Sequence, residues 1–277
     1  MGNPYNIKEL KKIANDIRKD ILSIIFISQA GHPGGSLSAT DLVTALYFSV
    51  LNVDPSNPKW PSRDRFILSK GHACPVWYAA LAERGYFDKS KLNTLRKLDS
   101  ILQGHADMNK TPGVDMTVGS LGQGVGVGIG MALASKYLNL DYYTWVLVGD
   151  GECQEGSIWE AAMAGNKWKL DNLTVIVDDN KIGNDSFTEI TMPVEPLSDK
   201  WKSFGWKVFE CNGHDMQDIL NTLMQAKNTP NIPTAVIAQT IKGKGVSFME
   251  NNPEWHGKAP TANEFELAMD ELNQIIE

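Results

Sequence analysis

Apolar residues follow two different spacings along this chain. Near the start they recur every three or four positions, and Asn6 with Glu9 three positions later is typical of a capping box. The apolar positions of this stretch are Ile7, Leu10, Ile13, Ile17, Ile21 and Ile24. The pattern predicts one helix over residues 6–28 that ends at Gly31, and a second helix is predicted over residues 38–51.

Continuous β-branched runs dominate the second half. The segments TWVLV at 144–148 and LTVIV at 173–177 are typical of buried parallel strands, and a helical stretch at 156–168 lies between them. The other predicted elements are strands at 65–69, 206–210 and 234–239 and helices from about Pro75 and at 215–227. Because strands alternate with helices, the sequence predicts an α/β fold, a doubly wound, mostly parallel sheet with helices on both faces.

Two stretches complete this outline. Residues 104–119 have no apolar period and predict a long loop, which in a compact domain is usually functional. From Thr261 onward the sequence predicts an amphipathic helix. Its apolar face would carry Phe265, Met269, Leu272 and Ile276. With no linker and no internal repeat in the sequence, we expect a single domain over residues 1–277.

Composition narrows the class of protein. The chain is 42% hydrophobic, and its 26 Lys and Arg against 33 Asp and Glu give a net charge of −7 without a basic cluster, which argues against a nucleic-acid partner. The three cysteines form no CxxC pair, so neither a disulfide framework nor a zinc site is expected. Neither a signal peptide nor an apolar run of the ~18–20 residues that span a membrane is recognisable. We expect a cytoplasmic protein with no membrane partner.

Polar residues follow two of the predicted buried strands. Asp150 comes directly after the strand at 144–148, and Asn180 closely follows the strand at 173–177. Because parallel strands present their carboxyl ends at one edge of a sheet, both side chains are expected at the edge where α/β folds bind ligands. A carboxylate, an amide oxygen and a backbone carbonyl form a hard oxygen site that suits Mg2+ held together with ligand phosphates. The alternative is that GDG is a simple turn and that Asn180 caps a helix.

The sequence around these two positions resembles that of a known family. GDG followed by Asn about thirty residues later is the thiamine-diphosphate motif, and GDGECQEGSIWEA with VIVDDNKIG resembles transketolase. The resemblance implies that Asp150, Asn180 and the carbonyl of Ile182 bind Mg2+, for which Ca2+ or Mn2+ could substitute. It also implies that Gly151 and Asn180 contact the diphosphate of thiamine diphosphate.

A glycine-rich segment, GSLGQGVGVGIG, begins at residue 119. It contains GxGxxG patterns, but no strand precedes it, so a dinucleotide loop is poorly supported. Glycines 124–130 are expected to permit close helix packing. Gly119, Ser120 and Leu121 resemble the transketolase segment that lies against the thiazolium side of the cofactor, and the resemblance implies that they bind it.

Four of the five histidines stand beside glycine or proline in predicted loops. AGHPGGSLS contains His32, SKGHACP contains His72, QGHADMNKTPG contains His105, and EWHGKAP contains His256. Histidine suits proton exchange near neutral pH, although a structural role is the alternative for each of them. Resemblance to transketolase implies that His32 and His256 are catalytic and contact the sugar. It places His72 beside cofactor and substrate as a further catalytic residue, adds His256 to the cofactor contacts, and lets His105 bind the donor ketose.

Other polar residues leave two interpretations open. In IKGKGV, the resemblance implies that Lys242 faces the cofactor, whereas the alternative is a solvated lysine. Glu155 and Glu160 match transketolase glutamates at the subunit interface, or they are ordinary acids near the start of a helix. His214 begins a predicted helix, and a structural role is expected for it.

The resemblance runs from about residue 10 to residue 260 and implies a transketolase that moves a two-carbon ketol unit from a ketose phosphate to an aldose phosphate. Full-length transketolases continue into a domain that holds the aminopyrimidine ring of the cofactor. The predicted amphipathic helix at the end of the sequence favours a separate subunit over a truncated enzyme. We therefore expect activity only with a C-terminal, pyrimidine-side partner subunit of about 300 residues, in an α2β2 heterotetramer that serves the pentose phosphate pathway.

Two rival hypotheses stay open at this point. The first is a two-subunit thiamine-dependent ketol transferase for a modified sugar, or a relative of 1-deoxyxylulose-phosphate synthase. The second is a non-catalytic regulatory or nucleotide-binding domain of similar fold. Intact Asp150 and Asn180, together with the four loop histidines, argue against the second.

Overall fold

One five-stranded sheet organises the chain. The computed structural model describes residues 5–275, and its strands are all parallel in the order β1-β2-β3-β5-β4. They are β1 (Arg65–Leu68), β2 (Thr144–Gly149), β3 (Leu173–Asp179), β4 (Lys207–Asn212) and β5 (Thr234–Gln239). Gly149 pairs with Asp178, and Asp179 pairs with Gln239, so β2, β3 and β5 end at nearly the same level. The predicted parallel α/β fold is confirmed.

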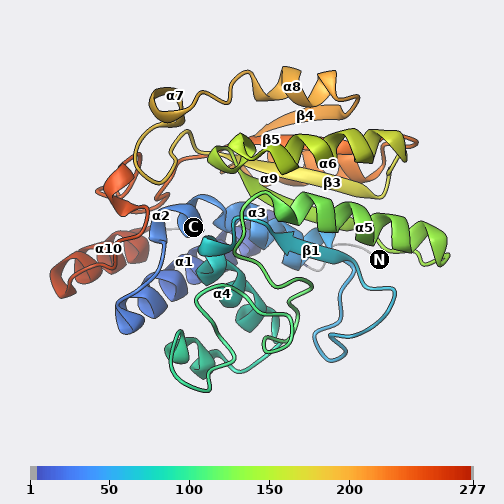
Figure 1. The fold of residues 1–277 in the computed structure, drawn as a ribbon. Coiled ribbons are helices and arrows are strands. Elements are labelled where there is room, and N and C mark those ends of the chain that lie inside the picture. Colours follow the sequence, from blue (N-terminus) through green and yellow to red (C-terminus); the bar gives the residue numbers. More distant parts are fainter. Residues whose placement is uncertain (1–4, 276–277) are drawn as a thin grey trace.

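Helices cover both faces of this sheet. In Figure 1, α5 (Gln123–Tyr137) and α6 (Gly156–Lys167) pack side by side in front of it. From β4 the chain turns back through α9 (Met216–Lys227) to β5, so a right-handed connection places α9 on the opposite face. There α9 contacts α3 (Thr40–Ala45) and α1 (Ile7–Ser28). The remaining helices are α2 (Pro33–Ser38), α4 (Cys74–Arg84), α7 (Thr188–Thr191), α8 (Leu197–Ser203) and α10 (Ala262–Gln274), with short helical turns at Leu46–Val50, Gly71–Ala73, Lys89–Thr94, Gly151–Gln154 and Pro253–Trp255.

The first and last helices form as their sequences predict. Asn6 and Glu9 make the reciprocal capping box of α1, and Thr261 and Glu264 make the same motif at α10. The two helices pack against each other, with Phe265 stacked on Phe26 at a ring-centroid distance of 4.4 Å. Ile276, which was expected on the apolar face of the last helix, lies outside the described residues.

One local prediction was wrong, and a second was confirmed in part. Helical structure begins at Pro33 rather than Ser38, because proline already has the backbone angle of a first helical turn and lacks the N–H that such a turn leaves unpaired. In α5, Gly124 and Gly128 permit close packing as expected, since added Cβ atoms would lie 2.4 Å from the Ser69 hydroxyl and 2.6 Å from Val146. The other two glycines of the stretch, at 126 and 130, face open space within the described chain. Among the described helices, none combines the length and apolar character needed to cross a membrane.

Candidate active site

A cavity of about 400 Å³ lies at the carboxyl ends of the strands. Segments that follow β1, β2, β3 and β5 contribute to its wall, together with α2 and the loop before α5. The predicted residues that line it are His32, His72, His105, Gly119, Leu121, Asp150, Gly151, Glu155, Asn180, Ile182, Lys242 and His256. Residues from eight separate sequence motifs therefore meet in one place, as the strand-end argument anticipates.

Asp150 is a buried carboxyl without a complete set of partners. Its side chain follows β2 directly and the residue is 1% exposed, yet Oδ2 accepts no hydrogen bond from the described residues. Burial raises the pKa of Asp150 to about 7, and the nearby carboxylates of Asp178 and Asp179 act in the same direction. A buried carboxyl oxygen normally has a hydrogen-bond donor or a cation as its partner. Because Asp150 lines the cavity, a ligand bound there could supply that partner.

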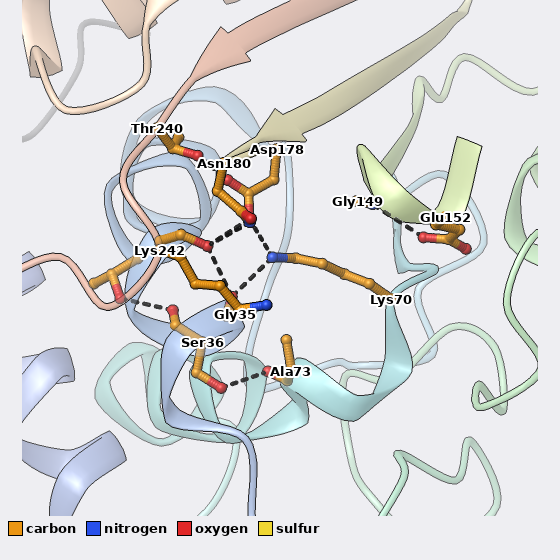
Figure 2. A network of polar contacts seen from close by, with 12 residues as sticks. Gly35, Ser36, Lys70, Ala73, Gly149, Glu152, Asp178, Asn180, Thr240 and Lys242 are labelled. Atoms are coloured by element: carbon orange, nitrogen blue, oxygen red, sulfur yellow. Dashed lines mark hydrogen bonds and ion pairs between the residues drawn. The ribbon is translucent and has the colours of Figure 1, made fainter. Parts of the chain in front are cut away.

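Asn180 is oriented by a second buried carboxylate, Asp178. Asn180 Nδ2 donates to Asp178 Oδ2 at 3.1 Å, which fixes the amide and leaves Oδ1 to accept from the Ile182 N–H at 3.2 Å. Asp178 also accepts from Ser38 Oγ at 2.5 Å. Its other donors are the Lys70 ammonium and the Thr240 hydroxyl (Figure 2).

Asp178 is fully buried, and ionising its carboxyl there costs desolvation free energy that nearby partners must offset. Burial raises its pKa, but the Lys70 ammonium and the hydroxyl donors outweigh burial and hold the pKa below the ordinary value. This carboxylate therefore ties the ends of β1, β3 and β5 to α2, around the candidate ligand Asn180.

Glu152 is a second connecting carboxylate at the same edge. It accepts from the backbone N–H of Gly122 at 2.8 Å, from that of Gly149 at 3.0 Å, and from the Ser69 hydroxyl. These donors belong to the loop before α5, the end of β2 and the end of β1. Burial raises the pKa of Glu152, while its three donors oppose that rise. The Glu152 carboxylate thus fixes three segments of the cavity wall at once.

Three histidines form a cluster in the wall of the same cavity. The ring centroids of His32, His72 and His256 lie 5.0 to 5.4 Å apart. Burial lowers the pKa of His32 to about 4 and that of His256 to about 3, and it places the pKa of His72 well below its ordinary value. Nδ1 of His32 is buried and has no partner among the described residues. At neutral pH the cluster is therefore uncharged.

Lys242 connects this cluster to the metal-ligand candidates. Its side chain is buried, and Nζ donates to the carbonyls of Ile182 at 2.9 Å and Gly183 at 2.7 Å and to Nδ1 of His256 at 2.7 Å. Burial, with the Lys70 charge, lowers the pKa of Lys242 to about 7. The solvated-lysine interpretation is therefore wrong. The Ile182 carbonyl points toward a cation in this structure, as a metal ligand would.

The long loop at 104–119 carries His105 to the cavity. No helix or strand forms over these residues, as predicted. Gly119 adopts φ +145°, and a Cβ there would lie 3.4 Å from the His105 ring, so this glycine lets the loop fold closely onto the imidazole.

Two predicted site residues do not line the cavity. Ser120 is exposed beside Gly119, and Glu160 is exposed on α6. Glu155 is exposed at the rim, one residue before α6 begins. These placements fit residues that act at an interface, but the roles of Ser120, Glu155 and Glu160 stay predictions.

Sequence reasoning gave no role to several residues that build the site. Asp178 directly follows the strand predicted at 173–177 and belongs to β3 in the structure, and a carboxylate at the end of a buried strand is itself a signal for a fixed polar contact. Lys70 and Glu152 stand inside the quoted motifs, but their partners lie far away in sequence. His214 accepts from the Ile241 N–H at 2.8 Å and contacts Asp41, so the structural role expected for it is confirmed.

Comparison with known proteins identifies the family. Residues 9–273 match the family model described as transketolase, thiamine diphosphate binding domain. The chain belongs to this family. The predicted family, and its thiamine-diphosphate-binding part in particular, are thereby confirmed.

Some relatives match this chain over nearly their whole length, and others over less than half of it. One subunit of the apulose-4-phosphate transketolase of Phocaeicola vulgatus is 45% identical over 260 residues, which cover 94% of this chain and 92% of the relative. The 6-deoxy-6-sulfo-D-fructose transketolase subunit SqwG of a Clostridium species is 44% identical over 266 residues, which cover 96% of this chain and 97% of the relative. Human transketolase is 36% identical over 272 residues, which are 98% of this chain but 43% of the human protein.

Solved structures show the same relation. Transketolase from Leishmania mexicana superposes with a TM-score of 0.92 at 30% identity, over 97% of this chain and 42% of the other. Transketolase from Pichia stipitis, in complex with sedoheptulose-7-phosphate, superposes with a TM-score of 0.90 at 32% identity, over 95% of this chain and 40% of the other. This chain therefore corresponds to about two fifths of a single-chain transketolase, the part that binds the diphosphate, and its family is a family of enzymes.

Proposed function

We propose that this chain is the diphosphate- and magnesium-binding subunit of a two-chain transketolase, and that residues 1–277 act as one domain of it. The observation that carries the proposal is the cavity in which Asp150, Asn180, Lys242 and the histidine cluster meet. Relatives that match over nearly their whole length are named as transketolase subunits, which supports a divided enzyme.

The residues present fit a magnesium ion. The site would use Asp150 Oδ2, Asn180 Oδ1 and the carbonyl of Ile182, all hard oxygen donors, with ligand phosphates completing the shell. Asp150 Oδ2 is buried without a partner, and the Ile182 carbonyl accepts from an ammonium in the same cavity. Within residues 5–275 no three His, Cys, Asp or Glu side chains are grouped to hold a metal, so this site would depend on the phosphates. A metal ion beside Asp150 would also lower the pKa of that carboxyl.

The diphosphate would lie where the strand ends leave space. Gly151 is open enough that an added Cβ would meet its nearest neighbour at 3.6 Å, so the backbone permits a close ligand. Lys242 would supply positive charge there, and Gly119 and Leu121 would line the opposite side. Bound thiamine diphosphate supplies a carbon nucleophile that can cleave the bond next to a ketone.

The chain's own histidines would then handle protons of the sugar. A neutral imidazole can either accept a proton from a hydroxyl group or donate a hydrogen bond to a carbonyl oxygen. His32 and His256 are held neutral by burial and are 5.4 Å apart between ring centroids, so they can serve neighbouring oxygens of one substrate. We assign proton exchange to His32 and His256, cofactor and substrate contact to His72, and donor binding to His105.

For substrate, we propose a ketose that carries an anionic group and departs from the common pentose phosphates. The support is that the subunit-length relatives are named for apulose 4-phosphate and for a sulfonated fructose. The remaining active-site wall would come from a pyrimidine-side partner of about 300 residues. We propose an α2β2 assembly, with Glu155 and Glu160 at its subunit contacts, in the cytoplasm.

The experiment is a substrate panel on the chain reconstituted with its partner, with and without Mg2+. Xylulose 5-phosphate, apulose 4-phosphate and 6-deoxy-6-sulfofructose serve as donors, with pyruvate as the control for a deoxyxylulose-phosphate synthase. We expect transfer from at least one modified ketose, none from pyruvate, and loss of activity in EDTA. Use of pyruvate, or no magnesium-dependent binding of thiamine diphosphate, would refute the proposal.

A further inference from the structure

A buried charged cluster lies outside the cavity and has no part in the chemistry above. Arg18 of α1 pairs with Asp41 of α3, with 2.6 Å between the Arg18 NH2 nitrogen and Asp41 Oδ2. His214, in the turn before α9, places Nδ1 2.8 Å from the same Oδ2 oxygen. The three side chains are between 9% and 12% exposed. Burial raises the pKa of Asp41, but the Arg18 charge and the His214 contact outweigh it, so the carboxyl is ionised.

Both outer members of this cluster hold one backbone segment. His214 Nε2 accepts from the Ile241 N–H at 2.8 Å, and Arg18 Nε donates to the Lys244 carbonyl at 3.2 Å. Lys242 lies between these two contacts. We call residues 241–244 the lysine segment. A single carboxylate oxygen therefore fixes, through two side chains, both ends of the segment that carries Lys242.

The hydrogen bonds of His214 also show which of its ring nitrogens carries the proton. Nε2 of His214 accepts a hydrogen bond, so it carries a lone pair, and the ring proton resides on Nδ1, facing Asp41. An imidazolium could not accept from Ile241. The Lys242 ammonium has only carbonyl and imidazole partners in the described chain and no directly hydrogen-bonded carboxylate. Its location thus depends on the backbone that presents it.

We propose that Arg18, Asp41 and His214 are positioning residues that hold the lysine segment so that Lys242 reaches the cavity. This inference rests on the proposed function, because Lys242 matters only if the cavity binds a diphosphate. His214 acts through Lys242 and contacts nothing that reacts.

Two substitutions separate the two contacts of His214. His214→Asn keeps a donor near Asp41 but has no atom that reaches Ile241, whereas His214→Gln can still accept from the Ile241 N–H. In the chain reconstituted with its pyrimidine-side partner and Mg2+, calorimetry with thiamine diphosphate should show affinity weakened about tenfold or more in His214→Asn, since a buried backbone donor loses its acceptor. His214→Gln should stay within about threefold of the wild type.

A double-mutant cycle tests the route through Lys242. In a Lys242→Met background, His214→Asn should cause no further loss of affinity, because the side chain it positions is already gone. Hydrogen exchange at the Ile241 amide should accelerate in His214→Asn whether or not the cofactor is present. Arg18→Lys, which keeps a charge near Asp41 but loses the Nε donor, should weaken affinity in the same way and serves if His214→Asn fails to fold.

The matched control is Asp64→Asn. Asp64 is also a buried carboxylate, and it accepts from the backbone N–H groups of Asn52 and Tyr143 at the other end of the sheet. Its loss should lower stability but leave cofactor affinity unchanged. Wild-type affinity in both His214→Asn and Arg18→Lys, or additive effects with Lys242→Met, would overturn the inference. Absence of binding by the wild type would instead refute the proposed function, and Ile241 exchange would still report on the segment.

Discussion

Asp150→Asn should make the metal-free chain more stable while it destroys magnesium-dependent cofactor binding. Asp150 is buried, its Oδ2 has no partner among the described residues, and burial raises its pKa from 3.8 to about 7. An ionised carboxylate in this position is a cost that the metal offsets when the site is loaded. Asparagine removes the charge and nearly keeps the shape.

The size of the effect follows from linkage. Between pH 3.8 and about 7 the folded chain holds the Asp150 proton more tightly than the unfolded chain does. Stability from this group is therefore lost as pH rises, at ~1.4 kcal/mol per pH unit, and the loss reaches about 4 kcal/mol above pH 7. The asparagine Nδ2 would lack an acceptor, which costs about 1–3 kcal/mol. The net gain at pH 8 is then about 2 kcal/mol for the variant.

Urea unfolding of both proteins in EDTA, at pH 8 and at pH 5, measures this difference. The advantage of Asp150→Asn should be present at pH 8 and gone at pH 5, where the wild-type carboxyl is protonated. Comparing the two proteins at each pH cancels the contributions of the buried histidines and Lys242. The control Asp64→Asn should be less stable than the wild type at both pH values. A variant less stable than the wild type at pH 8, or one that keeps magnesium-dependent affinity in calorimetry, would refute the reasoning.

Three further predictions concern other walls of the cavity. His32→Ala and His256→Ala should each lower kcat by ~100–10,000-fold in steady-state assays of the reconstituted enzyme while cofactor affinity changes little; near-normal turnover in both would return these residues to a structural role. His105→Ala should act chiefly on the donor KM, and an effect on kcat alone would contradict its assignment. Glu152→Gln puts an amide against three donors, so urea unfolding should show a loss of about 1–3 kcal/mol, and an unchanged midpoint would show that the three contacts contribute nothing.

The sequence predicts the parts of the site that depend on strand ends. Because buried parallel strands end at one edge, the positions of Asp150 and Asn180 follow from two apolar runs and the polar residues behind them. Short motifs around His32, His72, His105 and the segment before α5 add the other walls through their resemblance to transketolase. For these residues the sequence predicts the location that the structure shows, and their chemical roles stay predictions.

The connecting network could not be predicted in this way. Ser38 and Asp178 are hydrogen-bonded although 140 positions separate them in the sequence. The Gly122 N–H donates to Glu152, which lies 30 positions away. Such contacts depend on how loops pack against the ends of the sheet, and no periodicity in either segment encodes them. For Lys242, the residue pattern alone is typical of an exposed loop, and only the resemblance to transketolase predicted that this side chain faces the cofactor. Its partners, the carbonyls of Ile182 and Gly183 and the His256 ring, could not be predicted from the sequence.

The need for a partner is the central claim, and reconstitution tests it most directly. In the measurement, the purified chain is assayed for ketol transfer with thiamine diphosphate, Mg2+ and a modified ketose, first alone and then with increasing amounts of the pyrimidine-side partner. The exposed half of the cofactor would otherwise stand in water, without the desolvated and preorganised setting that strengthens electrostatic catalysis. We predict no transfer by the chain alone and activity that saturates at a one-to-one ratio of the two chains. Full turnover by this chain alone, shown by mass spectrometry to be free of any second polypeptide, would contradict the account.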